Sequence, residues 1–249
     1  MRRFILVLMV VALSVVSCVS FAWRLPSLGR WWRGSLVSFG FSNSTGNTQS
    51  LAVNGALKLV YSRNQWINNF QASLDYGEDK GVVNRKAYFI ENDLRRFLNK
   101  SQRNFLAITA SNRVDYFSPF TYVSVLGAAY GRDFIQNDTI VLSGQLGPGL
   151  RHSKERDDGE VLNRLIAQPQ MGLTWNITSK ASLVETIRAE IGNPYNYFTS
   201  TTSFNNKIMK HLATSISFWV EHYSTLPPNS GADDKKTSTT TSVRLIYSF

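Results

Sequence analysis

The last thirteen residues, Thr237 to Phe249 (TSTTTSVRLIYSF), constrain the fold of this chain more than any other stretch. Apolar residues and threonines occupy every second position from Thr239 to Phe249, whereas the other register holds mostly serine, threonine and Arg244. This alternation predicts a β-strand with one oily face and one polar face. A transmembrane barrel needs aromatic residues at the membrane boundary, which Tyr247 and Phe249 supply, and a last strand that pairs with its first.

The first residues have the layout of a secretory signal peptide. An apolar run, Phe4 to Val16, follows Arg2 and Arg3 and is itself followed by small residues. Cleavage after Ala22 predicts a signal peptide over residues 1–22. A competing site would make Cys18, the only cysteine, a lipidated residue, and the sequence leaves both open. Without Cys18 the mature chain has no thiol chemistry, as suits an oxidising compartment.

Composition limits the remaining possibilities. No run reaches the roughly 18 apolar residues of a membrane helix. The formal net charge of +10 falls by two, to +8, when the signal peptide is removed. Lysines and arginines are scattered singly instead of clustered, so we expect no nucleic-acid partner.

Alternating segments recur along the whole chain and predict twelve strands. Their ranges are 35–42, 50–61, 66–76, 87–98, 104–112, 120–134, 139–151, 162–177, 181–192, 199–209, 212–225 and 237–249. Gly127 to Gly131 interrupts the sixth segment and indicates a bulge or close packing, and Pro169 inside the eighth requires a bulge or an unpaired position.

Connections between these segments indicate the topology. Those after even strands are short, whereas most of those after odd strands are longer, including the polar stretch Gly77–Lys86 and the aromatic stretch Asn193–Phe198. We therefore predict an all-β, transmembrane antiparallel up-and-down β-barrel of about twelve strands, with short periplasmic turns and longer extracellular loops. It would occupy residues 34–249, after an interfacial segment at 23–33 that contains Trp31 and Trp32. A soluble β-sandwich is the alternative.

Several of these stretches together resemble the DUF481 family, described as salt-induced outer-membrane proteins of the YdiY type. They are Trp32 to Asn47 (WRGSLVSFGFSNSTGN), the second strand ending with Trp66, Gly147 to Gly149 (GPG), and Leu226 to Phe249 with its Pro-Pro loop and LIYSF ending. The resemblance implies an outer-membrane barrel and no catalytic signature. Lys235, Lys236 and Thr237 stand where the family often has an Asp-Thr pair.

The polar faces of the strands would project into one lumen. Twelve residues are candidates to line it: Asn54, Lys58, Asp75, Glu91, Asp93, Arg95, Arg164, Gln168, Gln170, Arg188, Glu190 and Arg244. Rings of charge in an open lumen would set ion selectivity. Alternatively, acids and bases pair and fill it, because an unpaired buried charge is costly. The sequence leaves pore and plug open.

A weaker pattern points to an enzyme. His222 and Ser224 lie two residues apart in the lipid-facing register, as the base and nucleophile of an outer-membrane lipid hydrolase would. No orienting Asn or Asp is identifiable, and His152 beside Ser153 is weaker still because neighbours on a strand face opposite ways. Three dispersed histidines and no mature cysteine predict no metal site, and no cofactor motif is present.

The combined expectation is a non-enzymatic protein of the outer membrane of a Gram-negative bacterium, either a narrow solute or ion channel or an envelope structural or stress-related protein. The expected partners are outer-membrane lipids, the barrel-assembly machinery through Tyr247 and Phe249, and small solutes or ions. The first strand is the expected seam partner of the last. We also expect deletion of Phe249 to impair insertion more than it alters a finished barrel.

Overall fold

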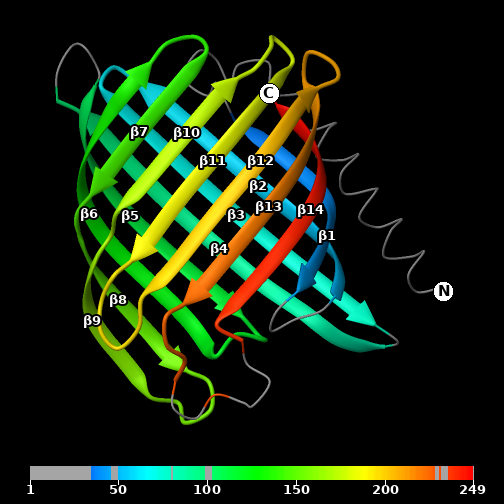
Figure 1. The fold of residues 1–249 in the computed structure, drawn as a ribbon, viewed down its shortest axis with the longest axis vertical. Coiled ribbons are helices and arrows are strands. Elements are labelled where there is room, and N and C mark those ends of the chain that lie inside the picture. The colour runs from blue at the N-terminus through cyan, green and yellow to red at the C-terminus, as the bar shows by residue number, and fades with distance from the viewer. Residues whose placement is uncertain are drawn as a thin grey trace.

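The chain folds into a closed antiparallel β-barrel (Figure 1). A computed structural model describes residues 35–45, 50–79, 81–98, 103–227, 230 and 235–248. The predicted signal peptide, the segment 23–33 and Phe249 lie outside these residues. Among the described residues no helix is long and apolar enough to cross a membrane.

Fourteen strand segments form the wall. They are β1 (Leu36–Thr45), β2 (Ser50–Arg63), β3 (Trp66–Asp79), β4 (Val82–Phe97), β5 (Asn104–Asp115), β6 (Phe120–Gln136), β7 (Ile140–Leu146), β8 (Pro148–Glu155), β9 (Val161–Ala167), β10 (Gln170–Asn176), β11 (Ala181–Glu190), β12 (Tyr197–Lys207), β13 (Leu212–Tyr223) and β14 (Thr237–Ser248). Because β7 continues into β8 and β9 into β10, the barrel has twelve strands, which confirms the prediction.

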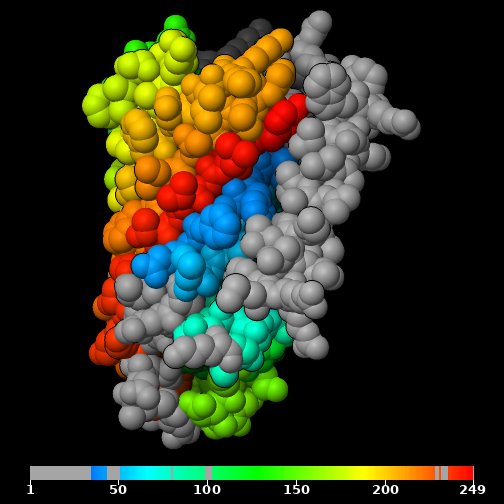
Figure 2. Space-filling view, turned by 90° about the vertical axis from the view of Figure 1, so that its right-hand side faces the viewer, coloured from blue at the N-terminus to red at the C-terminus, as the bar shows by residue number. Residues whose placement is uncertain are grey.

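The seam joins the first and last strands. β1 pairs with β14 along its whole length, from Leu36 opposite Ser248 to Thr45 opposite Thr239. Figure 2 shows this junction as β14 (red) lying directly against β1 (blue). The expected seam partner is therefore confirmed.

Two neighbouring strands break at the same height. β6 pairs with β7 on one side of Gly147 and with β8 on the other, and β9 and β10 separate at Gln168 and Pro169. A side chain at Gly147 would overlap the backbone of Ala128 on β6. The chain at Gly147 therefore lies closer to β6 than a residue with a side chain would allow. Pro169 falls in the break, which agrees with the unpaired position that its missing N–H requires.

Close packing also explains the small residues of β6. The Gln168 side chain leaves the break and lies where a Cβ on Gly127 would stand, and its Oε1 lies 2.6 Å from the position of a Cβ on Gly149. Glycine at these two positions therefore makes room for an amide inside the barrel. The alternation of apolar and polar residues is poor in this part of β6 because the space available, and not hydropathy, determines which residues fit.

One predicted loop was wrong. The polar stretch Gly77–Lys86 is largely strand, since β3 continues to Asp79 and β4 begins at Val82. Gly77 opposes Arg85, a register shift follows, and Gly81 has a φ of 87° in the turn. This stretch was read as loop because it is polar and lacks apolar alternation, yet Gly77 and Arg85 pair across the hairpin and are both buried. Similarly, Tyr197 and Phe198 belong to β12 instead of the aromatic loop.

The faces of the wall follow the predicted alternation. Ile90, Ile108 and Val243 point outward with more than half of their surface exposed, as expected of side chains that face lipid. Glu185 is an outward-facing acid among them, and it accepts hydrogen bonds from the hydroxyls of Ser200, at 2.7 Å, and Thr202.

Candidate functional site: the interior of the barrel

The strand registers place all twelve lumen candidates on the inner side. Cross-strand partners share a face, and Asn54 opposes Asp75, Gln71 opposes Glu91, and Gln170 opposes Arg188. Asn54 is 1% exposed, in contrast to the outward Leu74 at 51%. The inner positions belong to Asn54, Lys58, Asp75, Glu91, Asp93, Arg95, Arg164, Gln168, Gln170, Arg188, Glu190 and Arg244.

An ion pair between distant walls crosses the lumen. Arg188 on β11 donates from Nη2 to Glu91 Oε1 on β4 at 3.0 Å, and its Nη1 contacts Oε2, so the pair is bidentate. Four barrel strands separate β4 from β11 in one direction and six in the other. Gln71 Nε2 also donates to Glu91 Oε1 at 2.9 Å. The pair therefore ties nearly opposite sides of the barrel together.

A second group of ion pairs joins Glu190 to two arginines that are not among the twelve predicted lumen residues. Glu190 accepts from Arg113 Nη1 at 3.0 Å and lies 3.7 Å from Arg151 Nη1. Arg151 is 1% exposed and Glu190 2%, so these charges have almost no contact with solvent. Arg113 was missed because the fifth strand was predicted to end at Asn112. Arg151 lay in the inner register, which was the signal that it belongs to the site.

A third group lies further along β4. Arg95 Nε donates to Asp93 Oδ1 at 2.6 Å, and Thr109 donates to Oδ2 of the same carboxylate at 3.0 Å. The Arg95 guanidinium also lies 4.9 Å from the ring centroid of Phe105. We call the charged residues of these three groups the charged wall: Glu91, Asp93, Arg95, Arg113, Arg151, Arg188 and Glu190.

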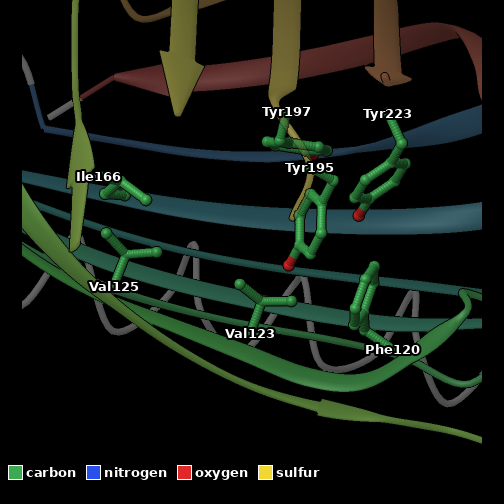
Figure 3. Packing of buried hydrophobic residues seen from close by; sticks show 7 residues of the cluster. All are labelled: Phe120, Val123, Val125, Ile166, Tyr195, Tyr197 and Tyr223. Atoms are coloured by element: carbon green, nitrogen blue, oxygen red, sulfur yellow. The ribbon is translucent and has the colours of Figure 1, made fainter. Parts of the chain in front are cut away.

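Aromatic rings fill the lumen toward the end that carries the long loops (Figure 3). Tyr195 comes from the connection between β11 and β12 and points inward, with its ring centroid 4.7 Å from Phe120 and 5.6 Å from Tyr223. Tyr197 lies 4.7 Å from Tyr223. The aromatic stretch was predicted as an outer loop, but Tyr195, 3% exposed, packs inside the barrel.

The arginines of the charged wall support this aromatic cluster. Arg151 lies 3.7 Å from the ring centroid of Tyr195 and donates from Nη2 to its carbonyl oxygen at 2.9 Å. Arg113 lies 4.0 Å from the ring centroid of Tyr197. A desolvated guanidinium over an aromatic face is stabilised by the ring quadrupole. Charge pairing and ring packing thus hold the same aromatic cluster.

Small hydroxyl residues line the inner side of three neighbouring strands. We call this group, on β1, β13 and β14, the hydroxyl wall: Ser38, Ser42, Ser215, Ser217, Thr240 and Ser242, all of them buried. Ser217 Oγ lies 2.8 Å from Ser203 Oγ on β12. At the seam, Arg244 Nε reaches over Gly40 and donates to Asn54 Oδ1 at 3.0 Å. Small side chains here leave room for the long ones of the charged wall.

The interior leaves little free space at the ion pairs. A cavity of about 20 Å³, the room for roughly one water, is bounded by residues that include Gln145, Gln168, Arg188 and Glu190. A larger cavity of about 300 Å³ lies among the short turns, near Lys180, Lys207 and His211. The space at the short-turn end is therefore larger than the space beside Arg188 and Glu190.

The structure does not bring the two hydrolase candidates together. His222 Nδ1 lies 2.8 Å from the hydroxyl oxygen of Thr237, and Ser224 Oγ accepts a hydrogen bond from the Asn196 backbone N–H at 2.8 Å. Each side chain thus contacts a loop or strand neighbour instead of the other candidate.

Of the two residues predicted to contact the barrel-assembly machinery, Tyr247 lies on the outer face, with its ring centroid 6.0 Å from that of His211.

Known structures share the architecture at low sequence identity. The NanC porin has 9% identity and a TM-score of 0.54, covering 86% of this chain and 100% of the porin. Outer membrane phospholipase A from Escherichia coli has 9% identity and a TM-score of 0.52, and the match covers 88% of this chain and 98% of the phospholipase. An outer membrane channel from Pseudomonas putida F1 has 10% identity and a TM-score of 0.51, and the match covers 89% of this chain and 98% of the channel. Such identities establish the fold alone.

The sequence itself gives the more specific relationship. No curated protein matches the chain. The family described as "Protein of unknown function, DUF481" matches residues 37–249, which include β2 to β14 and all of β1 except Leu36. Together with the closed barrel, this match shows that the chain belongs to the DUF481 family.

Proposed function

We propose that this protein is a non-enzymatic outer-membrane barrel with a closed lumen, which serves the envelope as a structural protein and does not conduct solutes at rest. The observation that carries the proposal is the bidentate pair between Glu91 and Arg188, which joins distant walls through the middle of the barrel. Glu91 is 4% exposed, so water has almost no access to it.

Burial of Glu190 and Arg151 supports the same function. A water-filled pore exposes the side chains that line it, because ions pass by exchanging hydration water for those groups. Glu190 and Arg151 are instead as buried as core residues and contact each other and an aromatic ring. Buried charges that are paired in this way fill a lumen instead of lining a path.

Conductance in planar lipid bilayers tests the proposal. We expect purified, refolded protein to give no stable current steps, with the NanC porin as the conducting control. Insertion is verified independently by flotation with the lipid. Steady conductance of the inserted wild-type protein would contradict a closed lumen.

A second candidate function is a narrow ion channel that opens when the aromatic cluster around Tyr195 moves out of the lumen. It is favoured by the origin of Tyr195, which comes from a connection and not from a barrel strand, so it can move without breaking strand pairing. Replacement of Tyr195 by Ala would then produce current steps in a protein that is otherwise silent. Trp66→Ala, on the outer face of β3, is the matched control for loss of an aromatic ring.

The two functions are separated by one comparison. If the wild-type protein and Tyr195→Ala are both silent, the ion pairs below the plug close the lumen by themselves and the structural function stands. If only Tyr195→Ala conducts, the connection is a gate and the channel function replaces it.

A further inference from the structure

Two neighbouring short turns enclose a pocket at the short-turn end of the barrel. The turn between β10 and β11 and the turn between β12 and β13 lie side by side at the top of Figure 1. They bound the cavity of about 300 Å³ that has Lys180 and Lys207 in its wall. This volume lies at the lower end of the range of small-molecule sites. We call the cavity the short-turn pocket.

Three polar side chains of the short-turn pocket lie on the inner face of the barrel. Asn205 pairs with Ser215 of the hydroxyl wall, and Ser182 pairs with Asn205. Asn176 in turn pairs with Ser182. Because cross-strand partners share a face, this row of small polar residues faces the lumen. A ligand would therefore reach Asn176, Ser182 and Asn205 from the mouth of the lumen and not from the lipid.

Three lysines surround these polar groups. Lys180 and Lys207 are neighbours across the sheet, because Lys207 N–H donates to the carbonyl oxygen of Lys180 at 2.7 Å. Lys210 lies in the turn between β12 and β13. All three line the pocket and are exposed. Cations that share one wall repel each other, and an anion among them would be attracted by all three.

Carboxylates do not compensate these charges within the described part of the chain. None of the described residues that line the pocket is Asp or Glu, and none of the three lysines forms an ion pair there. The neighbouring Asp138 contacts Asn176 through its backbone carbonyl oxygen, at 2.7 Å, and does not line the pocket. The pocket thus differs from the middle of the barrel, where Glu91 and Glu190 neutralise arginines.

Both turns are held by hydrogen bonds that do not use the lysine side chains. Thr178 Oγ1 accepts from the N–H of Ala181 at 2.9 Å and from that of Lys180 at 3.2 Å. His211 Nδ1 lies 2.9 Å from the carbonyl oxygen of Ser248 and ties the second turn to β14. The backbone around the pocket is therefore fixed, while the ammonium groups are available to a ligand.

The type of cation in the pocket favours phosphate over carboxylate. Arginine matches the planar carboxylate with a bidentate fork, whereas lysine acts as a point charge and is a common phosphate ligand. None of the described residues that line the pocket is arginine. A phosphate monoester carries a charge of about −1.5 to −2 at pH 7 and offers several acceptor oxygens. Such a group suits several lysines together with the hydroxyl of Ser182 and the amide of Asn205.

We propose that the short-turn pocket binds a small phosphate-bearing solute, with Lys180, Lys207 and Lys210 as its charged ligands. The solute enters from water at the mouth of the lumen, which in the outer-membrane barrel proposed above faces the periplasm. The phosphate of a lipid headgroup offers the same chemistry from the membrane, and the test separates the two sources. Binding does not depend on whether the lumen conducts, so the site stands apart from the proposed function.

Isothermal titration of the refolded full-length barrel with glycerol 3-phosphate, in an uncharged detergent, tests the site. We expect one molecule per chain, bound more tightly than acetate, and weaker binding as the salt concentration rises. Lys180→Gln and Lys207→Gln should each weaken binding about tenfold, because each removes a hydrogen bond between charged groups. Both lysines are exposed, so these variants are expected to fold.

Two further variants separate a built pocket from surface charge. Lys154→Gln, on β8 at the long-loop end, removes the same charge away from the pocket and should change the affinity less than about twofold, because distant exposed charges are screened. Ser182→Leu keeps every charge but fills the pocket, so it should abolish binding. The lysine variants keep the proposal testable if Ser182→Leu does not fold.

Dihexanoylphosphatidylglycerol, a soluble short-chain lipid, supplies the lipid arm. It should bind more weakly than glycerol 3-phosphate, because its acyl chains do not suit a polar pocket at the mouth of the lumen. Tighter binding of the lipid would overturn the assignment to a solute. Absence of glycerol 3-phosphate binding by the wild-type protein, equal affinity for acetate, unchanged binding by the lysine variants or by a folded Ser182→Leu, or an equal loss in Lys154→Gln would each overturn the site.

Discussion

The charged wall and the hydroxyl wall line the same lumen with side chains of different length and charge. On the charged wall, long side chains reach far from their own strands, as Arg188 does to Glu91. On the hydroxyl wall, short side chains reach only the next strand, as Ser217 does to Ser203 on β12. Side-chain size is complementary across the barrel, because long residues need a facing surface of small ones to pack without voids.

The difference also concerns what happens when a residue is removed. A buried charge that loses its partner is left without solvation, whereas a hydroxyl that loses its partner leaves only a modestly polar neighbour. We therefore expect substitutions on the charged wall to destabilise the barrel several times more than those on the hydroxyl wall. The following predictions test this contrast in order of expected size.

The largest effect is expected for Glu190→Gln. The substitution leaves Arg113 and the fully buried Arg151 without their carboxylate and should lower the free energy of unfolding by about 3–5 kcal/mol. Urea unfolding in detergent micelles, followed by tryptophan fluorescence, measures it. Asp138→Asn, in an exposed turn, is the control and should stay within about 0.5 kcal/mol of wild type. Equal stability of Glu190→Gln would mean that the charged wall is solvated.

A double-mutant cycle at Glu91 and Arg188 tests whether pairing matters more than polarity. Each single change to Gln should destabilise the barrel by about 3–5 kcal/mol. The double variant should recover about 1–3 kcal/mol relative to the sum, because it leaves no unpaired charge. Additive effects in the same unfolding assay would show that the two side chains act independently.

Gly40→Ala tests the seam between β1 and β14, where Gly40 lies beneath the long side chain of Arg244. A Cβ at Gly40 would overlap the carbonyl oxygen of Val243 and lie 2.9 Å from Arg244 Cγ. We expect a loss of about 1–3 kcal/mol from overpacking, measured as above. Gly55→Ala on β2 is the matched control, because the nearest atoms there are 3.9 Å from the added Cβ.

The smallest effect is expected for Ser217→Ala on the hydroxyl wall. It removes the contact with Ser203 Oγ and should cost about 0.5–1.5 kcal/mol, the usual net contribution of one hydrogen bond. A loss as large as that of Glu190→Gln would abolish the contrast between the two walls.

Much of the fold was predictable because barrel strands repeat a local rule. Alternation placed Asn54, Glu91 and Arg188 on the inward-facing side of their strands, and the count of alternating segments gave twelve strands. Prediction failed where locally polar residues still pair, as in Gly77–Lys86, and where a strand runs beyond its apolar part, which left out Arg113. A loop residue gives no sign of its direction, so Tyr195 inside the lumen was not foreseen.

The sequence by itself determined that this chain is a twelve-stranded barrel and which side chains face inward, because period-two alternation depends only on neighbours along the chain. Only the tertiary structure gave grounds to propose a plug instead of a pore. That outcome depends on which inward residues meet across the barrel, and Glu91 and Arg188 stand 97 residues apart. Distances between walls are set by closure of the sheet, which no local pattern encodes.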